Sequence, residues 1–278
     1  MKRLLPSVLA LVAATPALAA TDRAAVIDTY ADIAQAGYED SLITARALQE
    51  AVAALVADPS EATLAAARTA WLAARDPYQQ TEVYRFGNPI VDDWEGKVNA
   101  WPLDEGLIDY VDTSYAGPTD ENELAAANVI ANPALRIAGQ EVDAGTITPA
   151  LIADTLNEAD GIETNVARGY HAIEFLLWGQ DLNGTGPGAG DRPFTDYAQG
   201  EACTGGNCDR RADYLTAATD LLISDLEEMA AAWAEDGAAR AAVTADPDAG
   251  LVAMLTGMGS LSYGEQAGER MRLGLMLN

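Results

Sequence analysis

The feature that most constrains the fold is the helical spacing of apolar residues in long, alanine-rich segments. Between residues 21 and 56, apolar side chains recur with the period of a helix rather than of a strand. They are Ile27, Tyr30, Ala34, Tyr38, Leu42 and Leu55. Alanine and leucine dominate the chain, and alternating valine and isoleucine are scarce. The sequence therefore predicts an all-α fold, a helical bundle of about five long helices and several short ones.

Helix-start residues and changes of period predict where the other helices lie. Asp58, Pro59 and Glu61 predict a second helix with Asp58 as its N-cap, running to about residue 86 with a kink at Pro77. Segment 87–149 has no sustained period and is expected to be an ordered excursion, and 179–208 is expected to be a long loop. The further helices are expected at 104–111, 121–131, 149–156, 161–178, 209–234 and from residue 246 to the end.

The first 19 residues have the pattern of a secretory signal. Lys2 and Arg3 precede an apolar run over 4–12, and small residues at 17–19 form a cleavage site. The apolar run is too short to span a bilayer. We therefore expect a protein of the periplasm or cell envelope that does not span the membrane, with residues 20–278 forming the helical domain.

The chain is strongly acidic, with 43 acidic and 16 basic residues and a formal net charge of −27. Nucleic acids and anionic lipids, which are polyanions, are therefore expected to be poor partners. Two explanations of the charge stay open: a solvated surface adapted to salty surroundings, or attraction of cations and basic partners.

The two cysteines, Cys203 and Cys208, lie in the short segment CTGGNC. In an oxidising compartment, two thiols this close together favour a local disulfide. A soft-metal site would need more thiolates or histidines nearby.

The single histidine of the chain, His171, lies three residues before Glu174 in a strongly helical stretch. Residues three apart on a helix project from the same face, so an imidazole and a carboxylate lie side by side. Such a pair is suited to binding a metal ion. One histidine cannot supply the two that an H-E-x-x-H zinc peptidase needs.

Two other helices carry apolar stripes that turn polar at one end. The stripe of the second helix ends in Glu82 and Arg85, and that of the last helix continues from Leu251, Leu255 and Met258 into acidic residues that include Glu265. These ends either emerge into water or converge with His171 on one internal site. In the second case the metal ligands are His171, Glu174, Glu82 and Glu265, and Arg85 or Arg270 orients a carboxylate.

Further carboxylates lie in the segment DDWE, which contains Asp92, Asp93 and Glu95. Asp93 and its neighbours either reach the same cleft and support the ligands, or belong to a solvated loop anchored by Trp94 and Trp101.

At RGYHAIEFLLWGQD the chain resembles the imelysin-like family, whose signature G-x-H-x-x-E is matched by Gly169, His171 and Glu174. Three longer segments resemble the iron-regulated branch of that family. They are YRFGNPIVDDWEGKVNAWPLDEGLIDYVD, CTGGNCDRRADYL and GEQAGERMRLGLML. The likeness covers nearly the whole chain after residue 19.

The resemblance implies an all-helical protein of two bundle-like halves, about 20–150 and 151–278, with the site between them. It implies a periplasmic protein that binds a metal, iron, through His171 and Glu174 and assists iron acquisition together with envelope iron-uptake proteins. It also implies that the sequence is truncated, so that the second half is incomplete at its C-terminal end.

Two other functions stay open. The family has long carried a peptidase label, so a metal-dependent peptidase of the imelysin type is the alternative, and whether the protein is an enzyme is left open. A third possibility is an interaction protein of the envelope whose polar cleft binds a peptide or a haem-like ligand, with His171 as an axial ligand.

Overall fold

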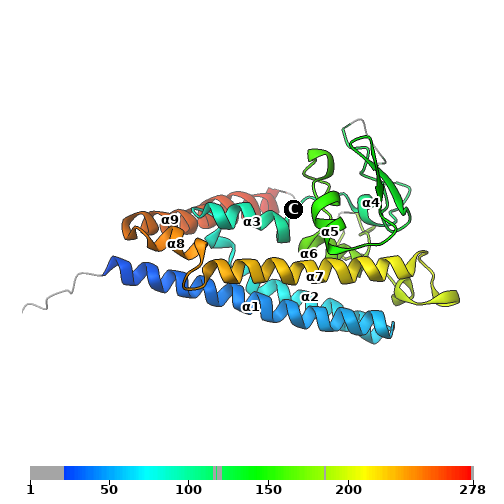
Figure 1. Cartoon of the computed structure of the whole chain (residues 1–278), viewed down its shortest axis with the longest axis horizontal. Coiled ribbons are helices and arrows are strands. Elements are labelled where there is room, and N and C mark those ends of the chain that lie inside the picture. Colours follow the sequence, from blue (N-terminus) through cyan, green and yellow to red (C-terminus); the bar gives the residue numbers. More distant parts are fainter. Residues whose placement is uncertain (1–21, 115–116, 118–120, 185, 277–278) are drawn as a thin grey trace, which may run out of the picture.

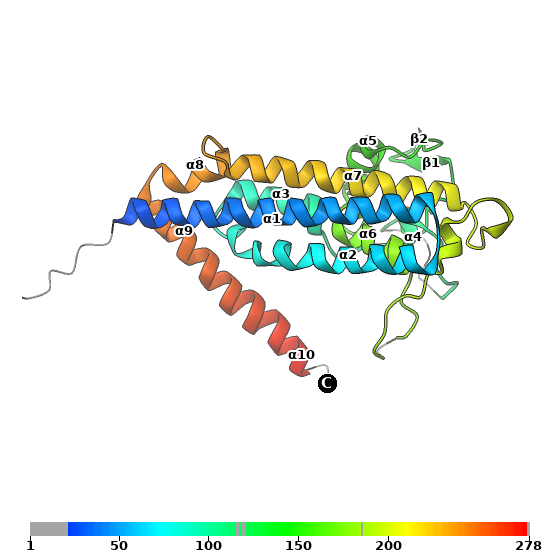
Figure 2. The same cartoon turned by 90° about the horizontal axis from the view of Figure 1, so that it is seen from below.

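Three long helices run side by side through the molecule. The computed structural model describes residues 22–114, 117, 121–184 and 186–276, so the predicted signal sequence 1–19 lies outside the described residues. The long helices are α1 (Arg23–Ala57), α2 (Glu61–Gln80) and α7 (Cys208–Trp233). Helix α1 packs against both α2 and α7 (Figures 1 and 2). The predicted all-α bundle is confirmed.

Shorter elements connect and cover these helices. They are the 3-10 turn η1 (Glu82–Tyr84), α3 (Pro89–Asn99), α4 (Glu105–Ile108), β1 (Ala134–Ile137), β2 (Gln140–Asp143), α5 (Pro149–Leu151), the π-helical turn η2 (Ile152–Leu156), the 3-10 turn η3 (Ala159–Gly161), α6 (Gly169–Trp178), the 3-10 turns η4 (Phe194–Tyr197) and η5 (Gly200–Ala202), α8 (Ala238–Thr244), α9 (Pro247–Gly259), the π-helix η6 (Ser260–Met271) and α10 (Arg272–Met276). None of the described helices combines the length and the apolar character needed to cross a bilayer.

One continuous hydrophobic core runs through the bundle. It extends from Ile27 on α1 to Val243 on α8 and includes the apolar faces of α2, α6 and α7. Helix α7, which belongs to the second predicted half, packs along α1 of the first. The core is therefore shared across residue 150, and the division into two halves stays a prediction.

Helix α2 begins two residues later than the sequence pattern suggested. Its N-cap is Ser60, whose hydroxyl accepts from the Thr63 amide at 3.2 Å, while the Thr63 hydroxyl accepts from the Ser60 amide at 3.0 Å. The predicted N-cap Asp58 is instead the C-cap residue of α1. The prediction was wrong because both residues are good caps, and Thr63 completes the capping box with Ser60.

Helix α2 also ends earlier than predicted, at Gln80, with Pro77 inside its last turn. The chain then forms η1, turns at Gly87 and enters α3, which Asn88 caps and Pro89 opens. Segment DDWE is thus helical, and the prediction of a solvated loop anchored by two tryptophans was wrong. Trp94 is buried inside the bundle, whereas Trp101 is 74% exposed.

The region after α3 contains a hairpin that the sequence did not predict. The helix expected at 104–111 is the shorter α4, and the one expected at 121–131 is absent, with turns in its place. Strands β1 and β2 pair antiparallel around Ala138 and Gly139, which both have positive φ. This is the backbone of a tight two-residue hairpin turn. Without an Asn-Gly or Asp-Gly pair, the turn gave no strong signal.

Helix α6 begins at Gly169, eight residues after the predicted start. Asp160 and Gly161 adopt left-handed conformations that interrupt any longer helix. Gly169 has a φ of 81°, and a Cβ at this position would lie 2.5 Å from the Val98 carbonyl oxygen. Only glycine therefore allows α6 to start this close to α3.

The long segment before α7 is closed by the predicted disulfide between Cys203 and Cys208, which is present. Its described residues, which leave out residue 185, form only the short turns η4 and η5 before α7, in agreement with the loop predicted for 179–208.

The last helix leaves the bundle. It starts where predicted, with Asp246 as N-cap of α9, and continues through η6 into α10. Figure 2 shows this helix running away from α1 and α2. Leu255 and Met258 are exposed, so the predicted core stripe on this helix was wrong beyond Leu251, which packs against the core.

Candidate functional site

His171 and Glu174 lie side by side on α6. The distance from His171 Nδ1 to Glu174 Oε2 is 3.0 Å. The two side chains are 22% and 43% exposed, so both reach solvent from an otherwise buried helix. An imidazole nitrogen and a carboxylate oxygen at this separation can face the same small ligand.

Helix α2 fixes the position of α6. The Trp71 indole Nε1 donates to the Tyr170 carbonyl at 2.9 Å, and Arg68 Nη2 donates to the Leu177 carbonyl at 3.0 Å. Because these contacts hold the backbone at both ends of α6, the exposed face that carries His171 is held in one orientation.

The pair opens onto a pocket of about 460 Å³, here called the His171 pocket. Its walls combine tryptophan rings, a phenylalanine, aliphatic side chains, carboxylates and the backbone of two loops. The residues that line it are Trp71, Leu72, Trp101, Leu103, Glu105, His171, Glu174, Phe175, Trp178, Gly179, Asp181, Gly188, Ala189 and Gly190.

Glu105, the first residue of α4, is a site residue that the sequence reading missed. Burial raises the pKa of its carboxyl to about 7, and the nearby charges of Asp181 and Glu174 act in the same direction, while Arg192 opposes them. No pattern in the sequence separates Glu105 from the other acidic residues. Only the fold, which places α4 opposite α6, shows that it belongs to this pocket.

The two other predicted metal ligands lie in a different pocket. Glu82 and Glu265 line a cavity of about 530 Å³, here called the Glu82 pocket. Arg270 Nη2 lies 2.7 Å from Glu82 Oε1, and Arg85 Nη2 lies 3.7 Å from Glu265 Oε1. Trp101 lines both pockets. Glu82 departs from the expected stripe because α2 ends before it, so it lies in η1.

Arg85 and Arg270 contact carboxylates of the Glu82 pocket, and their role in orienting a metal ligand stays a prediction. Arg85 Nη1 also lies 3.3 Å from Glu95 Oε2. Asp93 is exposed on α3 and lines neither pocket.

Within the described residues, no group of three or more histidine, cysteine, aspartate or glutamate side chains is arranged to bind a metal ion. The four predicted ligands form two separate pairs. Among the described residues, arginines contact Glu82 and Glu265, whereas none forms an ion pair with Glu174. An N and an O donor fit as part of a metal site. The assignment of all four as ligands stays a prediction.

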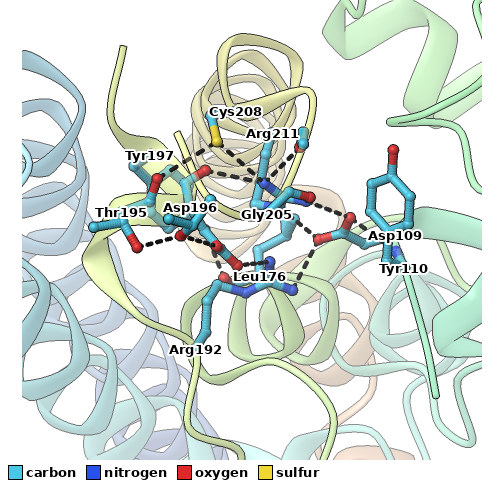
Figure 3. Close-up of polar contacts among 12 residues, drawn as sticks. Asp109, Tyr110, Leu176, Arg192, Thr195, Asp196, Tyr197, Gly205, Cys208 and Arg211 are labelled. Atoms are coloured by element: carbon cyan, nitrogen blue, oxygen red, sulfur yellow. Dashed lines mark hydrogen bonds and ion pairs between the residues drawn. The ribbon is translucent and has the colours of Figure 1, made fainter. Parts of the chain in front are cut away.

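A buried network of ion pairs joins α4, α7 and the loop that follows α6. Asp109, at the end of α4, accepts from Arg211 Nε at 2.6 Å and from Arg211 Nη2 at 2.8 Å (Figure 3). Arg192 Nη2 lies 2.8 Å from Asp109 Oδ2, and Arg192 Nη1 lies 3.1 Å from Asp196 Oδ2. Burial alone would raise the pKa of Asp109, but the hydrogen bond from Arg211 and the two positive charges hold it below its usual range.

This network ties α4 to α7 and to the loop that follows α6. Arg211 Nη1 also donates to the Gly206 carbonyl inside the disulfide loop. The network therefore places α4, and with it Glu105, relative to α6.

Comparison with protein families gives one match over most of the chain. The family model described as Imelysin, whose short name is that of a peptidase family, matches residues 34–278.

Two individual proteins are similar to this chain. Iron-regulated protein A of Synechococcus elongatus is 36% identical over 77 residues, which are 27% of this chain and 20% of that protein. A crystal structure described as an iron-regulated protein A precursor from Parabacteroides distasonis superposes with a TM-score of 0.52 at 21% identity. That superposition covers 87% of this chain and 58% of the other, and it shows a shared fold.

Proposed function

We propose that this chain, which belongs to the imelysin family, binds iron through His171 and Glu174 and assists iron acquisition in the periplasm or cell envelope. The observation that carries the proposal is the side-by-side placement of one imidazole and one carboxylate, 3.0 Å apart, in the lining of a pocket. Imidazole and carboxylate are ligands that suit iron.

The relatives support the same reading. Two similar proteins are described as iron-regulated protein A, and this chain spans 20% and 58% of their lengths. The predicted signal sequence at 1–19 supports export, and envelope iron-uptake proteins are the proposed partners.

The chain's own groups suggest an exchangeable site. His171 and Glu174 are partly exposed, and a pair of side chains leaves other coordination positions open. Such a metal would be accessible to a partner, as delivery requires. Asp181, and Glu105 above its pKa of about 7, would add negative charge in the same pocket that favours any cation.

Calorimetric titration of chelator-stripped protein with ferrous iron under anaerobic conditions tests the proposal. We expect His171→Ala to lower the affinity at least about tenfold, because one of two ligands is lost. Glu174→Gln should act in the same direction. Glu141→Gln on β2, which removes one exposed carboxylate of the hairpin, is the charge-matched control and should bind as the unchanged protein does.

Two results would change the conclusion. Unaltered affinity and stoichiometry in His171→Ala, with an intact helical circular dichroism spectrum, would exclude the proposed ligands. Weaker binding in Glu82→Gln or Glu265→Gln would restore the predicted four-ligand site. Cleavage of casein that a chelator stops and Glu174→Gln abolishes would favour the peptidase alternative instead.

A further inference from the structure

The His171 pocket has an aromatic wall. Three of the chain's five tryptophans line it, together with Phe175. The Trp71 and Trp178 rings meet edge to face with their centroids 5.3 Å apart. Trp71 is almost fully buried, whereas Trp101 is 74% exposed and lies next to open solvent. The wall of the pocket therefore combines the buried ring of Trp71 with the solvent-accessible ring of Trp101.

Carboxylates outnumber basic groups in this pocket, where His171, 3.0 Å from Glu174, is the one basic side chain among the described lining residues. Its described lining carries the carboxylates of Glu105, Glu174 and Asp181 and contains no lysine or arginine. Arg68 and Arg75 lie over Trp178 and Trp71 but are not among the lining residues. The Glu82 pocket differs, since Arg85 and Arg270 line it and pair with its carboxylates.

Aromatic faces combined with several carboxylates, in a lining without lysine or arginine, select one class of ligand. Ring faces attract cations, most strongly the indole of tryptophan, and such cages recognise ammonium groups. An anion would be repelled, and a neutral apolar molecule would leave the carboxylates without a counter-charge. A bare metal ion would make no use of the indoles.

We propose that the His171 pocket binds an organic ammonium ion, with the positive group near Glu105, Glu174 and Asp181 and the apolar body against Trp71, Trp101 and Trp178. The volume of about 460 Å³ lies within the range of small-molecule sites, roughly 300–1,000 Å³. This inference does not depend on iron binding, because it uses the aromatic wall and the charge of the pocket.

Calorimetry with choline and its neutral isostere 3,3-dimethylbutan-1-ol tests the inference. Both titrations use metal-free protein in buffer that contains a chelator, with the ionic strength matched by sodium chloride. The two probes have nearly the same shape, so any difference reports the charge. We expect choline to bind at least about tenfold more tightly than the alcohol.

Single substitutions test whether choline binds in the His171 pocket. Trp101→Ala removes an exposed ring, so the fold should be kept, and we expect choline affinity to fall about tenfold, with Trp101→Phe recovering part of it. Glu105→Gln should also weaken binding. Glu141→Gln removes one negative charge outside the pocket, as Glu105→Gln does inside it, and should leave binding unchanged.

Equal affinities for choline and the alcohol would overturn the inference, and so would choline binding that survives both Trp101→Ala and Glu105→Gln. The iron titration is a separate measurement on the same protein. Choline binding without iron binding would contradict only the proposed function. Iron binding without choline binding would contradict only this inference.

Discussion

At the scale of single residues, Asp109 is a carboxylate that two buried arginines share. It is fully buried and accepts from both Arg211 and Arg192. Asp109→Asn would leave two buried guanidinium groups without their shared carboxylate. We expect the free energy of unfolding to fall by about 3–5 kcal/mol, the usual cost of breaking a buried ion pair on one side. Urea denaturation measured by circular dichroism gives this number.

Asp213→Asn is the matched control, because Asp213 is exposed on the same helix as Arg211. Its effect should stay within about 0.5 kcal/mol. If the two variants are equally stable, the network around Asp109 contributes no net stabilisation, and α4 must be held by its apolar contacts.

The raised pKa of Glu105 predicts that its contribution to the stability of the fold falls as the pH rises, whereas that of a salt-bridged carboxylate increases. Its pKa is raised from 4.5 to about 7 in the folded protein, so the folded state binds the proton more tightly than the unfolded state. Its contribution to stability is therefore greatest at low pH and is lost as the pH rises through this window. Thermal melts of the unchanged protein and of Glu105→Gln from pH 4.5 to 8 should diverge, with the variant gaining relative stability as the pH rises. A constant difference between the two would contradict the raised pKa.

At the scale of elements, the two possible caps of α2 give a sharp test. Ser60 accepts from the Thr63 amide, whereas within the described part of the chain the Asp58 side chain caps neither helix. We expect Ser60→Ala to destabilise the protein by about 1 kcal/mol and Asp58→Ala to cost less than about 0.5 kcal/mol. Chemical denaturation of both variants measures the contrast. The reverse order of the two effects would show that Asp58 caps the helix in solution.

The long helices could be predicted because their signals are local. The period of α1, the N-cap of α9 and the disulfide between Cys203 and Cys208 each depend on residues close together in the sequence. The late start of α6 could not be predicted in this way. It depends on the contact of Gly169 with the Val98 backbone, far away in the sequence.

In the candidate site, too, local features could be predicted from the sequence and long-range contacts could not. The pairing of His171 with Glu174 is a property of one helical turn, and the structure has it. The position of Glu82 depends on where α2 ends, and that of Glu105 depends on the packing of α4 against α6. Arg270 and Arg85, which contact the two other predicted ligands, are brought there by the path of the last helix. Such long-range contacts leave no regular pattern in a single sequence.

At the scale of the whole molecule, the net charge of −27 opposes compaction through repulsion between like charges. Exposed ion pairs such as Arg46 with Glu227 and Lys97 with Glu228 act in the other direction, but each contributes little. Salt weakens both effects, because the screening length falls from about 30 Å at 0.01 M to about 3 Å at 1 M. We expect the repulsion to outweigh the ion pairs at a net charge of −27, so added salt should stabilise the protein.

We therefore expect Tm to rise when sodium chloride is increased from 10 mM to 0.5 M at neutral pH. Each kcal/mol gained would raise Tm by about 2–4 °C for a chain of this size. Potassium chloride should act equally, because screening does not distinguish the two cations, whereas a bound cation would make the curves differ. Differential scanning calorimetry at both salts measures the effect. A Tm that falls with added salt would mean that the exposed ion pairs contribute more than the repulsion. The acidic surface residues would then stabilise the fold through their ion pairs with lysine and arginine.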